Sequence, residues 1–123
     1  MAYLLAALGG AVGALARWGL SEAVRSTGGW PWATLLVNVS GCFLLGALFA
    51  TLAAHSPEPS WARPFLGVGV LGGYTTYSTF AVEVVDRVDD GALLLAAGYV
   101  LVSVVGGAAA VALGAIVAGR AAR

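Results

Sequence analysis

The sequence predicts an all-α membrane protein with four transmembrane helices, the third of which is broken at mid-membrane. Of its 123 residues, 60% are hydrophobic and only 10% are charged, against roughly 25% charged residues in an ordinary soluble domain. Four apolar stretches are long enough to approach or exceed the roughly 20 residues that a helix needs to cross the hydrocarbon. Glycines and hydroxyl residues interrupt the third stretch, and glycine disfavours helix.

The spans are expected at 3–20, 32–54, 65–85 and 92–119. Short connections rich in glycine, proline and polar residues separate them. The first stretch has no basic start, so we expect a retained span rather than a cleaved signal peptide. The fourth is longer than a perpendicular helix requires, so we expect it to tilt or extend beyond the bilayer. Residues 1–123 are therefore predicted to form a single transmembrane domain.

The arginines predict no preferred orientation in the membrane. They divide evenly, with Arg63, Arg120 and Arg123 on one side and Arg17, Arg25 and Arg87 on the other. Membrane topology follows an asymmetry of Lys and Arg, so this balance allows insertion both ways. Two oppositely inserted copies could then pair as an antiparallel homodimer. A fixed topology set by another feature is the alternative.

Composition excludes several classes of function. The formal net charge is zero, and no basic patch suited to nucleic acid is present. The single cysteine, Cys42, excludes an intramolecular disulfide and a multi-cysteine metal site, and we expect it to be a small buried apolar residue. The single histidine, His55, falls in a connection and is expected to be solvated. Without a nucleophile–base pair or a set of metal ligands, the chain is not predicted to be an enzyme.

Small residues spaced four apart predict close packing of the helices. Such pairs are Gly9 and Gly13, Gly10 and Ala14, Ala110 and Gly114, and Gly114 and Ala118. Three tryptophans fall at predicted span ends, where amphipathic rings favour the membrane interface. They are Trp30, Trp32 and Trp61.

Polar side chains recur along one face of the second span and one face of the fourth. Thr34 and Asn38 are four apart in the second, and Tyr99 and Ser103 are four apart in the fourth. Polar groups within spans usually face a protein interior or a water-filled path. Each pair therefore either lines a path or makes hydrogen bonds between helices, and the spacing alone leaves both readings open.

The segment "GGYTTYSTF" at 72–80 lies at the middle of the third span. Its two glycines weaken the helix, and non-helical backbone at this depth is tolerated only inside protein or beside a cavity. Beyond the expected break, Tyr77 and Phe80 share one face, and Thr75 and Thr79 share another. The positive edges of aromatic rings beside hydroxyl donors suit an anion.

The spans as a whole are rich in hydrogen-bond donors and almost free of acids. Hydroxyls, the Asn38 amide and Arg17 favour an anion over a cation. A proton-coupled pump is expected to carry a carboxylate at mid-membrane, and the only one within a predicted span is Glu83, near the end of the third. Glu83 either borders the vestibule of a path or belongs to the acidic connection that contains Asp86.

Three stretches closely resemble the signature stretches of the Fluc (CrcB) family of fluoride channels. They are "GGAVGALARW" at 9–18, "ATLLVNVSGCFLLG" at 33–46 and "GVLGGYTTYSTF" at 69–80. The third is highly specific, and all three occur in the family's order. The number of spans and the polar face of the fourth agree as well, so the resemblance extends over essentially the whole chain.

The resemblance implies a passive fluoride-selective channel of the cell inner (plasma) membrane, which exports fluoride from the cytoplasm and confers fluoride resistance. It implies a dual-topology antiparallel homodimer with two pores. A structural sodium ion at the dimer centre would be held by the main-chain carbonyls of Gly72 and Thr75 from each subunit. Fluoride is small and tightly hydrated, so a selective pore must replace its water with closely spaced donors.

The resemblance also implies residues of the pore. Asn38 would line it, Tyr77 and Phe80 would form an aromatic box, and Arg17 would lie near a vestibule. Further donors along the path would be Ser78, Thr79, Tyr99 and Ser103. The chain departs from the family at Tyr74 and Tyr77, where phenylalanine is usual, so Tyr77 brings a hydroxyl that must find a partner.

Two other functions fit parts of the pattern. A small four-span exporter of drugs or guanidinium requires a carboxylate at the centre of its first span, but the first acid here is Glu22. A non-transporting scaffold subunit would use Asn38 and the broken helix for packing alone. Passive flux of fluoride but not of chloride through reconstituted protein would separate a channel from both.

Overall fold

The computed structural model describes residues 1–24 and 29–121, and these ranges are helical apart from short connections. The elements are α1 (Ala2–Ala23), α2 (Trp32–Ala54), η1 (Arg63–Leu71), α3 (Gly72–Tyr74), α4 (Tyr77–Asp89) and α5 (Leu93–Ala121). Among the described residues, α1, α2 and α5 are long and apolar enough to cross a membrane. This agrees with the predicted all-α membrane protein.

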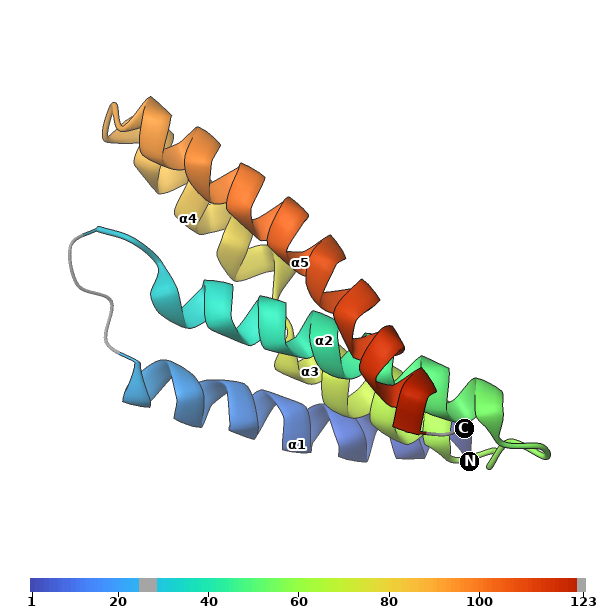
Figure 1. Cartoon of the computed structure of the whole chain (residues 1–123). Coiled ribbons are helices and arrows are strands. Elements are labelled where there is room, and N and C mark those ends of the chain that lie inside the picture. Colours follow the sequence, from blue (N-terminus) through green and yellow to red (C-terminus); the bar gives the residue numbers. More distant parts are fainter. Residues whose placement is uncertain (25–28, 122–123) are drawn as a thin grey trace.

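Helix α2 covers residues 32–54, the same range as the predicted second span, whereas α1 and α5 continue past the predicted ends at residues 20 and 119. Figure 1 shows the start of α1 and the end of α5 at the same end of the bundle. Arg25 and Arg123, which carry part of the predicted charge balance, lie outside the described residues.

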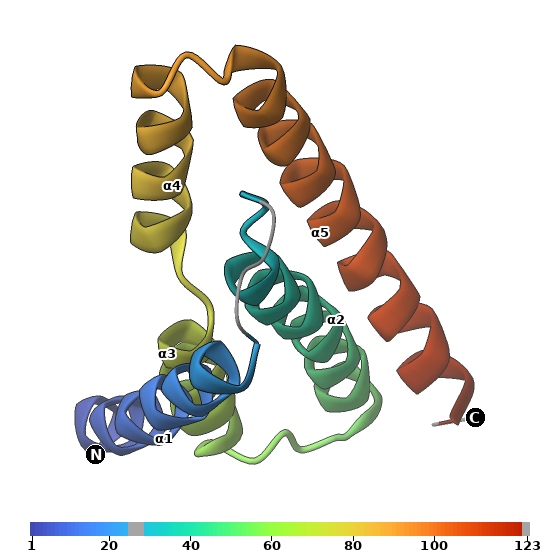
Figure 2. The same cartoon turned by 90° about the vertical axis from the view of Figure 1, so that its left-hand side faces the viewer.

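The helices pack as two pairs. α1 lies along η1 and α3, while α2 lies along α5. α4 leaves the break at an angle to η1 and runs antiparallel to the first turns of α5, and the two form a hairpin (Figure 2). The region predicted as the third span is therefore divided between the two pairs, and the break joins them.

The predicted break lies at Thr75 and Thr76, but the glycines before it remain helical. Thr75 has φ −75° and ψ 157°, and Thr76 has φ −143° and ψ 115°, so both are extended. Gly72 has φ −66° and ψ −35° and begins α3, which also contains Gly73. The interpretation of these glycines as the point of weakness is therefore wrong, and the chain leaves helical geometry only after Tyr74.

The glycines instead allow α1 and the broken segment to approach closely. A Cβ atom on Gly73 would collide with the main chain of Gly10. A Cβ atom on Gly13 would lie 2.8 Å from the Tyr74 nitrogen and would also collide with the Val70 oxygen. Main-chain atoms cannot move aside as side chains do, so this contact requires glycine. The small-residue spacing of the first span is confirmed as a helix contact.

The second pair is built in the same way. A Cβ atom on Gly114 of α5 would lie 3.0 Å from the Ala47 nitrogen of α2 and would overlap the Phe43 oxygen. One on Gly46 would overlap the Val111 oxygen. α2 and α5 therefore touch through their backbones, as the spacing of small residues around Gly114 predicted.

The connection from α2 to η1 is held by Arg63. Its guanidinium donates to both carboxylate oxygens of Glu58, at 2.6 and 2.9 Å, and its Cζ lies 5.4 Å from the centre of the Phe49 ring. The hydrogen bond from Arg63 lowers the pKa of the Glu58 carboxyl below its ordinary value. His55 is exposed, as predicted.

Candidate functional site

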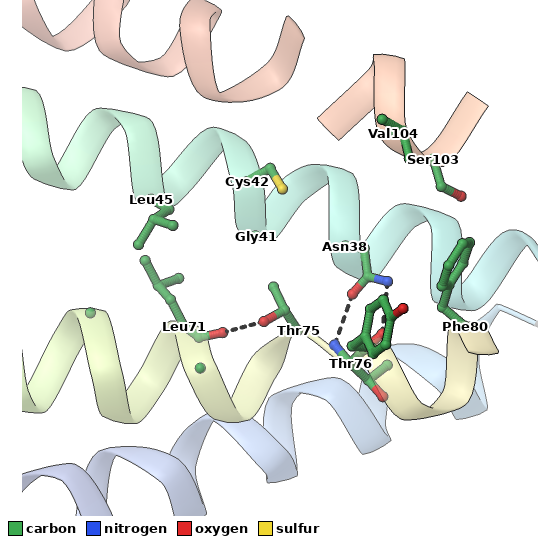
Figure 3. A pocket seen from close by; sticks show the side chains of 13 residues that line it. Asn38, Gly41, Cys42, Leu45, Leu71, Thr75, Thr76, Phe80, Ser103 and Val104 are labelled. Atoms are coloured by element: carbon green, nitrogen blue, oxygen red, sulfur yellow. Dashed lines mark hydrogen bonds between the residues drawn. The ribbon is translucent and has the colours of Figure 1, made fainter. Parts of the chain in front are cut away.

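Asn38 of α2 binds both main-chain groups of Thr76 at the break. Its Oδ1 accepts from the Thr76 nitrogen at 2.8 Å, and its Nδ2 donates to the Thr76 oxygen at 2.9 Å (Figure 3). Extended backbone between two helices leaves such groups without helical partners, and unpaired buried groups are costly. The amide supplies one donor and one acceptor, which is what this residue needs. Asn38 therefore fixes the geometry of the break.

Thr76 is the buried centre of the break and was not among the predicted site residues. Its side chain caps α4: Oγ1 accepts from the Thr79 nitrogen at 3.1 Å and donates to Thr79 Oγ1 at 2.9 Å. Thr76 Oγ1 also lies 3.3 Å from Ser78 Oγ. A threonine immediately before a helix is a common N-cap, and this signal would have marked Thr76 as the point where helix resumes.

The bond from Thr76 N–H to Asn38 and the bond from Thr79 N–H to the Thr76 hydroxyl change the surroundings of the Gly72 and Thr75 carbonyl oxygens. In a continuous helix those oxygens would accept from the N–H groups of Thr76 and Thr79, four residues ahead. Here the Thr76 N–H donates to Asn38 and the Thr79 N–H donates to the Thr76 hydroxyl. The two carbonyls that the family resemblance singled out have therefore both lost the donors that a regular helix would provide.

A pocket of about 380 Å³ lies between α2, the broken segment and α5. The predicted site residues that line it are Asn38, Gly72, Thr75, Tyr77, Phe80 and Ser103. The rings of Tyr77 and Phe80 are 5.9 Å apart. Ser103 Oγ is buried and has no hydrogen-bond partner among the described residues. Cys42 is half-buried and also lines the pocket, so the expectation that it is a buried residue is wrong.

Glu83 lies among the helices. Its carboxylate accepts from Thr34 Oγ1 of α2 at 2.8 Å and from the Tyr99 hydroxyl of α5 at 2.7 Å. The ring of Tyr99 is 5.1 Å from the ring of Phe80, which lines the pocket. Glu83 therefore makes its contacts within the helix bundle, and the interpretation that it borders a vestibule stays a prediction. Thr34, treated in the sequence as one of a polar pair, joins this cluster.

The other predicted residues lie outside the pocket lining. Ser78 and Thr79 are exposed at the start of α4, and Thr79 bonds with Thr76. Arg17 is half-buried on α1, one turn beyond Gly13. Trp30 packs its ring 5.9 Å from that of Tyr99, so it faces the protein more than the predicted membrane interface.

The two tyrosines that depart from the family pattern have different surroundings. Tyr74 Oη lies 2.9 Å from Ser40 Oγ of α2, which satisfies its hydroxyl inside the bundle. Tyr77 is 82% exposed, and no hydrogen bond of its hydroxyl is found among the described residues. Tyr77 therefore presents both ring and hydroxyl at the outer surface of the pocket.

Comparison with known proteins identifies the family. Residues 4–115 match the family model described as CrcB-like protein, Camphor Resistance (CrcB). The chain belongs to the CrcB family. The three long apolar helices among its described residues, together with its family, make it a multi-pass membrane protein.

Several CrcB relatives carry the name fluoride-specific ion channel FluC. The one from Bordetella petrii is 46% identical over 91% of this chain and 87% of its own. FluC 1 of Mycobacterium bovis is 44% identical over 91% of this chain and 86% of its own. The one from Solibacter usitatus is 46% identical over 98% of this chain and all of its own.

Proposed function

We propose that this chain is a fluoride-selective channel through which fluoride leaves the cytoplasm passively across the inner (plasma) membrane, so that it confers fluoride resistance. Relatives that share 44 to 46% of its residues over nearly their full length are named fluoride-specific ion channels. In this family the chain acts in ion transport and is not an enzyme. The observation that carries the proposal is a row of amide, hydroxyl and aromatic groups in the pocket and beside it. This row consists of Asn38, Ser103, Tyr77, Phe80 and Tyr99.

The chemistry of that row suits a small anion. Ser103 brings a hydroxyl without a partner among the described residues to the pocket, and Asn38 Nδ2 has a second N–H beyond the one bound to Thr76. The rings of Tyr77 and Phe80 offer positive edges. Donors held by helices replace the water that fluoride loses on entry. The path then continues along Phe80 to the ring of Tyr99, whose hydroxyl donates to the Glu83 carboxylate.

The pocket is open on one side of the single chain, and a second copy suits that side. Gly72 and Tyr77 of the pocket lining are exposed, and so are Ser78 and Thr79, which follow Tyr77 in α4. Three of these residues bear polar groups that a lipid tail cannot satisfy. An antiparallel homodimer would cover them, and each of two pores would then be lined by both subunits. In that arrangement Ser78 and Thr79 act as donors, and Arg17 and Glu83 lie at the vestibules.

A sodium ion at the centre of that dimer fits the carbonyls at the break. Gly72 and Thr75 from each subunit would hold it, since both oxygens have lost the donors of a regular helix. Oxygen atoms of unwound helices are suitable ligands for this ion. When bound, it supplies a fixed positive charge that ties the two breaks together.

Purified protein in liposomes is expected to release fluoride down its gradient and to retain chloride. The reason is that the donor-rich, acid-poor row compensates the dehydration of a small anion better than that of a larger one. Ion-selective electrodes measure both effluxes from the same preparation. Equal efflux of the two anions, or no efflux from folded protein, contradicts the proposal. Transport that requires a proton gradient would instead support an exporter.

Glu83→Gln is expected to lower the fluoride efflux rate about tenfold, which corresponds to about 1.4 kcal/mol. Glutamine keeps one acceptor oxygen and has an N–H₂ group in place of the other, so either Thr34 or Tyr99 loses its acceptor and must turn its hydroxyl proton elsewhere. Initial efflux rates per reconstituted channel provide the measurement. Glu22→Gln, an exposed acid on α1, is the matched control and should leave the rate unchanged. If both variants behave alike, Glu83 has no part in the path.

A further inference from the structure

Arg87 joins three parts of the protein around Tyr99. It lies one turn beyond Glu83 on α4, and its Nη1 donates to the Glu83 carbonyl oxygen at 2.5 Å. Its Nη2 donates to the carbonyl oxygen of Gly29, in the connection before α2, at 2.7 Å. Its Cζ lies 5.5 Å from the centre of the Tyr99 ring of α5. A planar guanidinium can make these bonds and stack on a ring at the same time, whereas an ammonium cannot.

Tyr99 is held on several sides as a result. Its side chain is fully buried. The centre of its ring lies 5.1 Å from that of Phe80 and 5.9 Å from that of Trp30, which meets it edge-on, and Arg87 contacts the ring as well. These contacts fix the plane of the ring, so the hydroxyl has one direction, toward the Glu83 carboxylate at 2.7 Å. Two of these contacts, those of Trp30 and Arg87, come from residues outside the pocket lining, so the hydroxyl is positioned largely from beyond the pocket.

The acceptor at Gly29 depends on an unusual backbone conformation. Gly29 has φ +78°, a region that residues with a side chain rarely adopt. In this conformation its carbonyl accepts from Arg87, and the next residue, Trp30, packs on Tyr99. The connection before α2 is thus tied to α4 through the guanidinium, at the same place where Trp30 supports Tyr99.

We propose that Arg87 is a positioning residue for anion passage, acting through Tyr99. By bridging Gly29 and α4 and covering the Tyr99 ring, it keeps the Tyr99 hydroxyl on Glu83, at the end of the row that begins at Asn38. The inference rests on the proposed function, because it assigns a role in that same path. Its action depends on the shape of the guanidinium as well as on its charge.

The test compares fluoride efflux and the fluoride-to-chloride ratio per channel in liposomes. Arg87→Gln and Arg87→Lys are both expected to slow fluoride efflux about tenfold and to lower the ratio. Arg63→Gln is the matched control, since Arg63 also bonds two oxygens and stacks on a ring at 5.4 Å, at Phe49. That variant should stay within about twofold of the unmodified protein.

A double-mutant cycle tests the route through Tyr99. In a Tyr99→Phe background, Arg87→Gln should change the rate by less than about twofold, because the hydroxyl that it positions is already gone. A tenfold loss of fluoride efflux on adding Arg87→Gln to Tyr99→Phe overturns the inference. A normal fluoride efflux rate and a normal fluoride-to-chloride ratio in Arg87→Lys overturn it as well. If Arg87→Gln does not fold, the same cycle is run with Arg87→Lys. Absence of fluoride efflux from the unmodified protein would refute the proposed function itself, whereas normal efflux with silent Arg87 variants would refute only this inference.

Discussion

Replacing Asn38 with aspartate is expected to slow fluoride efflux by roughly 100-fold or more. A carboxylate oxygen would replace Nδ2, which donates to the Thr76 oxygen, and leaving that carbonyl without a donor costs about 1–3 kcal/mol. A negative charge in the pocket lining, unlike that of Glu83, which two hydroxyls bind, also repels the anion, by about 4 kcal/mol at about 4 Å in a partly solvated site. About 2.7 kcal/mol suffices for a 100-fold change. The measurement is initial efflux from liposomes, normalised to folded protein.

Asn38→Ala separates the two causes. It removes both bonds to Thr76 but adds no charge, so its rate should fall between those of the unmodified protein and Asn38→Asp. Equal rates for the two variants would mean that loss of the two hydrogen bonds between Asn38 and Thr76 accounts for the whole effect. Undiminished efflux in folded Asn38→Asp would show that this residue serves only for packing between helices.

Gly13→Ala is expected to destabilise the protein by about 2–3 kcal/mol, as overpacking of a tight contact does. The added Cβ would lie 2.8 Å from the Tyr74 nitrogen and would overlap the Val70 oxygen. Relief requires α1 to move away from η1 and α3, which also disturbs the break that follows Tyr74. Unfolding of the purified protein in detergent, followed by circular dichroism, measures the loss.

Gly19→Ala is the matched control on the same helix. A Cβ atom there meets nothing within 4 Å, so the better helix propensity of alanine should leave stability unchanged or raise it by up to about 1 kcal/mol. Because both variants gain the same propensity, their difference isolates the contact. If Gly13→Ala were as stable as Gly19→Ala, α1 and the broken segment would not touch as closely as the structure has them.

The polar residues show what the spacing of residues along a helix can predict about the site and what it cannot. Thr34 and Asn38 were expected to share a face, and they do, but they bind different partners: Thr34 binds Glu83 and Asn38 binds Thr76. Those partners lie 49 and 38 residues away in the chain. A periodicity argument works within one helix, so it cannot choose between pairings across helices. For the same reason it left Glu83 between two readings and did not mark Arg87 at all.

The sequence by itself determined which segments are helical and apolar, that glycines such as Gly13 and Gly114 lie at helix contacts, and the family. These properties depend on residues that are close in the sequence, or on the free energy of transferring whole segments from water into the hydrocarbon of the membrane. Only the tertiary structure decided that the break lies at Thr75 and Thr76, with Gly72 and Gly73 still helical. The reason is that Asn38 competes with the helix for the main-chain groups of Thr76, and a competitor on another helix becomes visible only when the helices are packed.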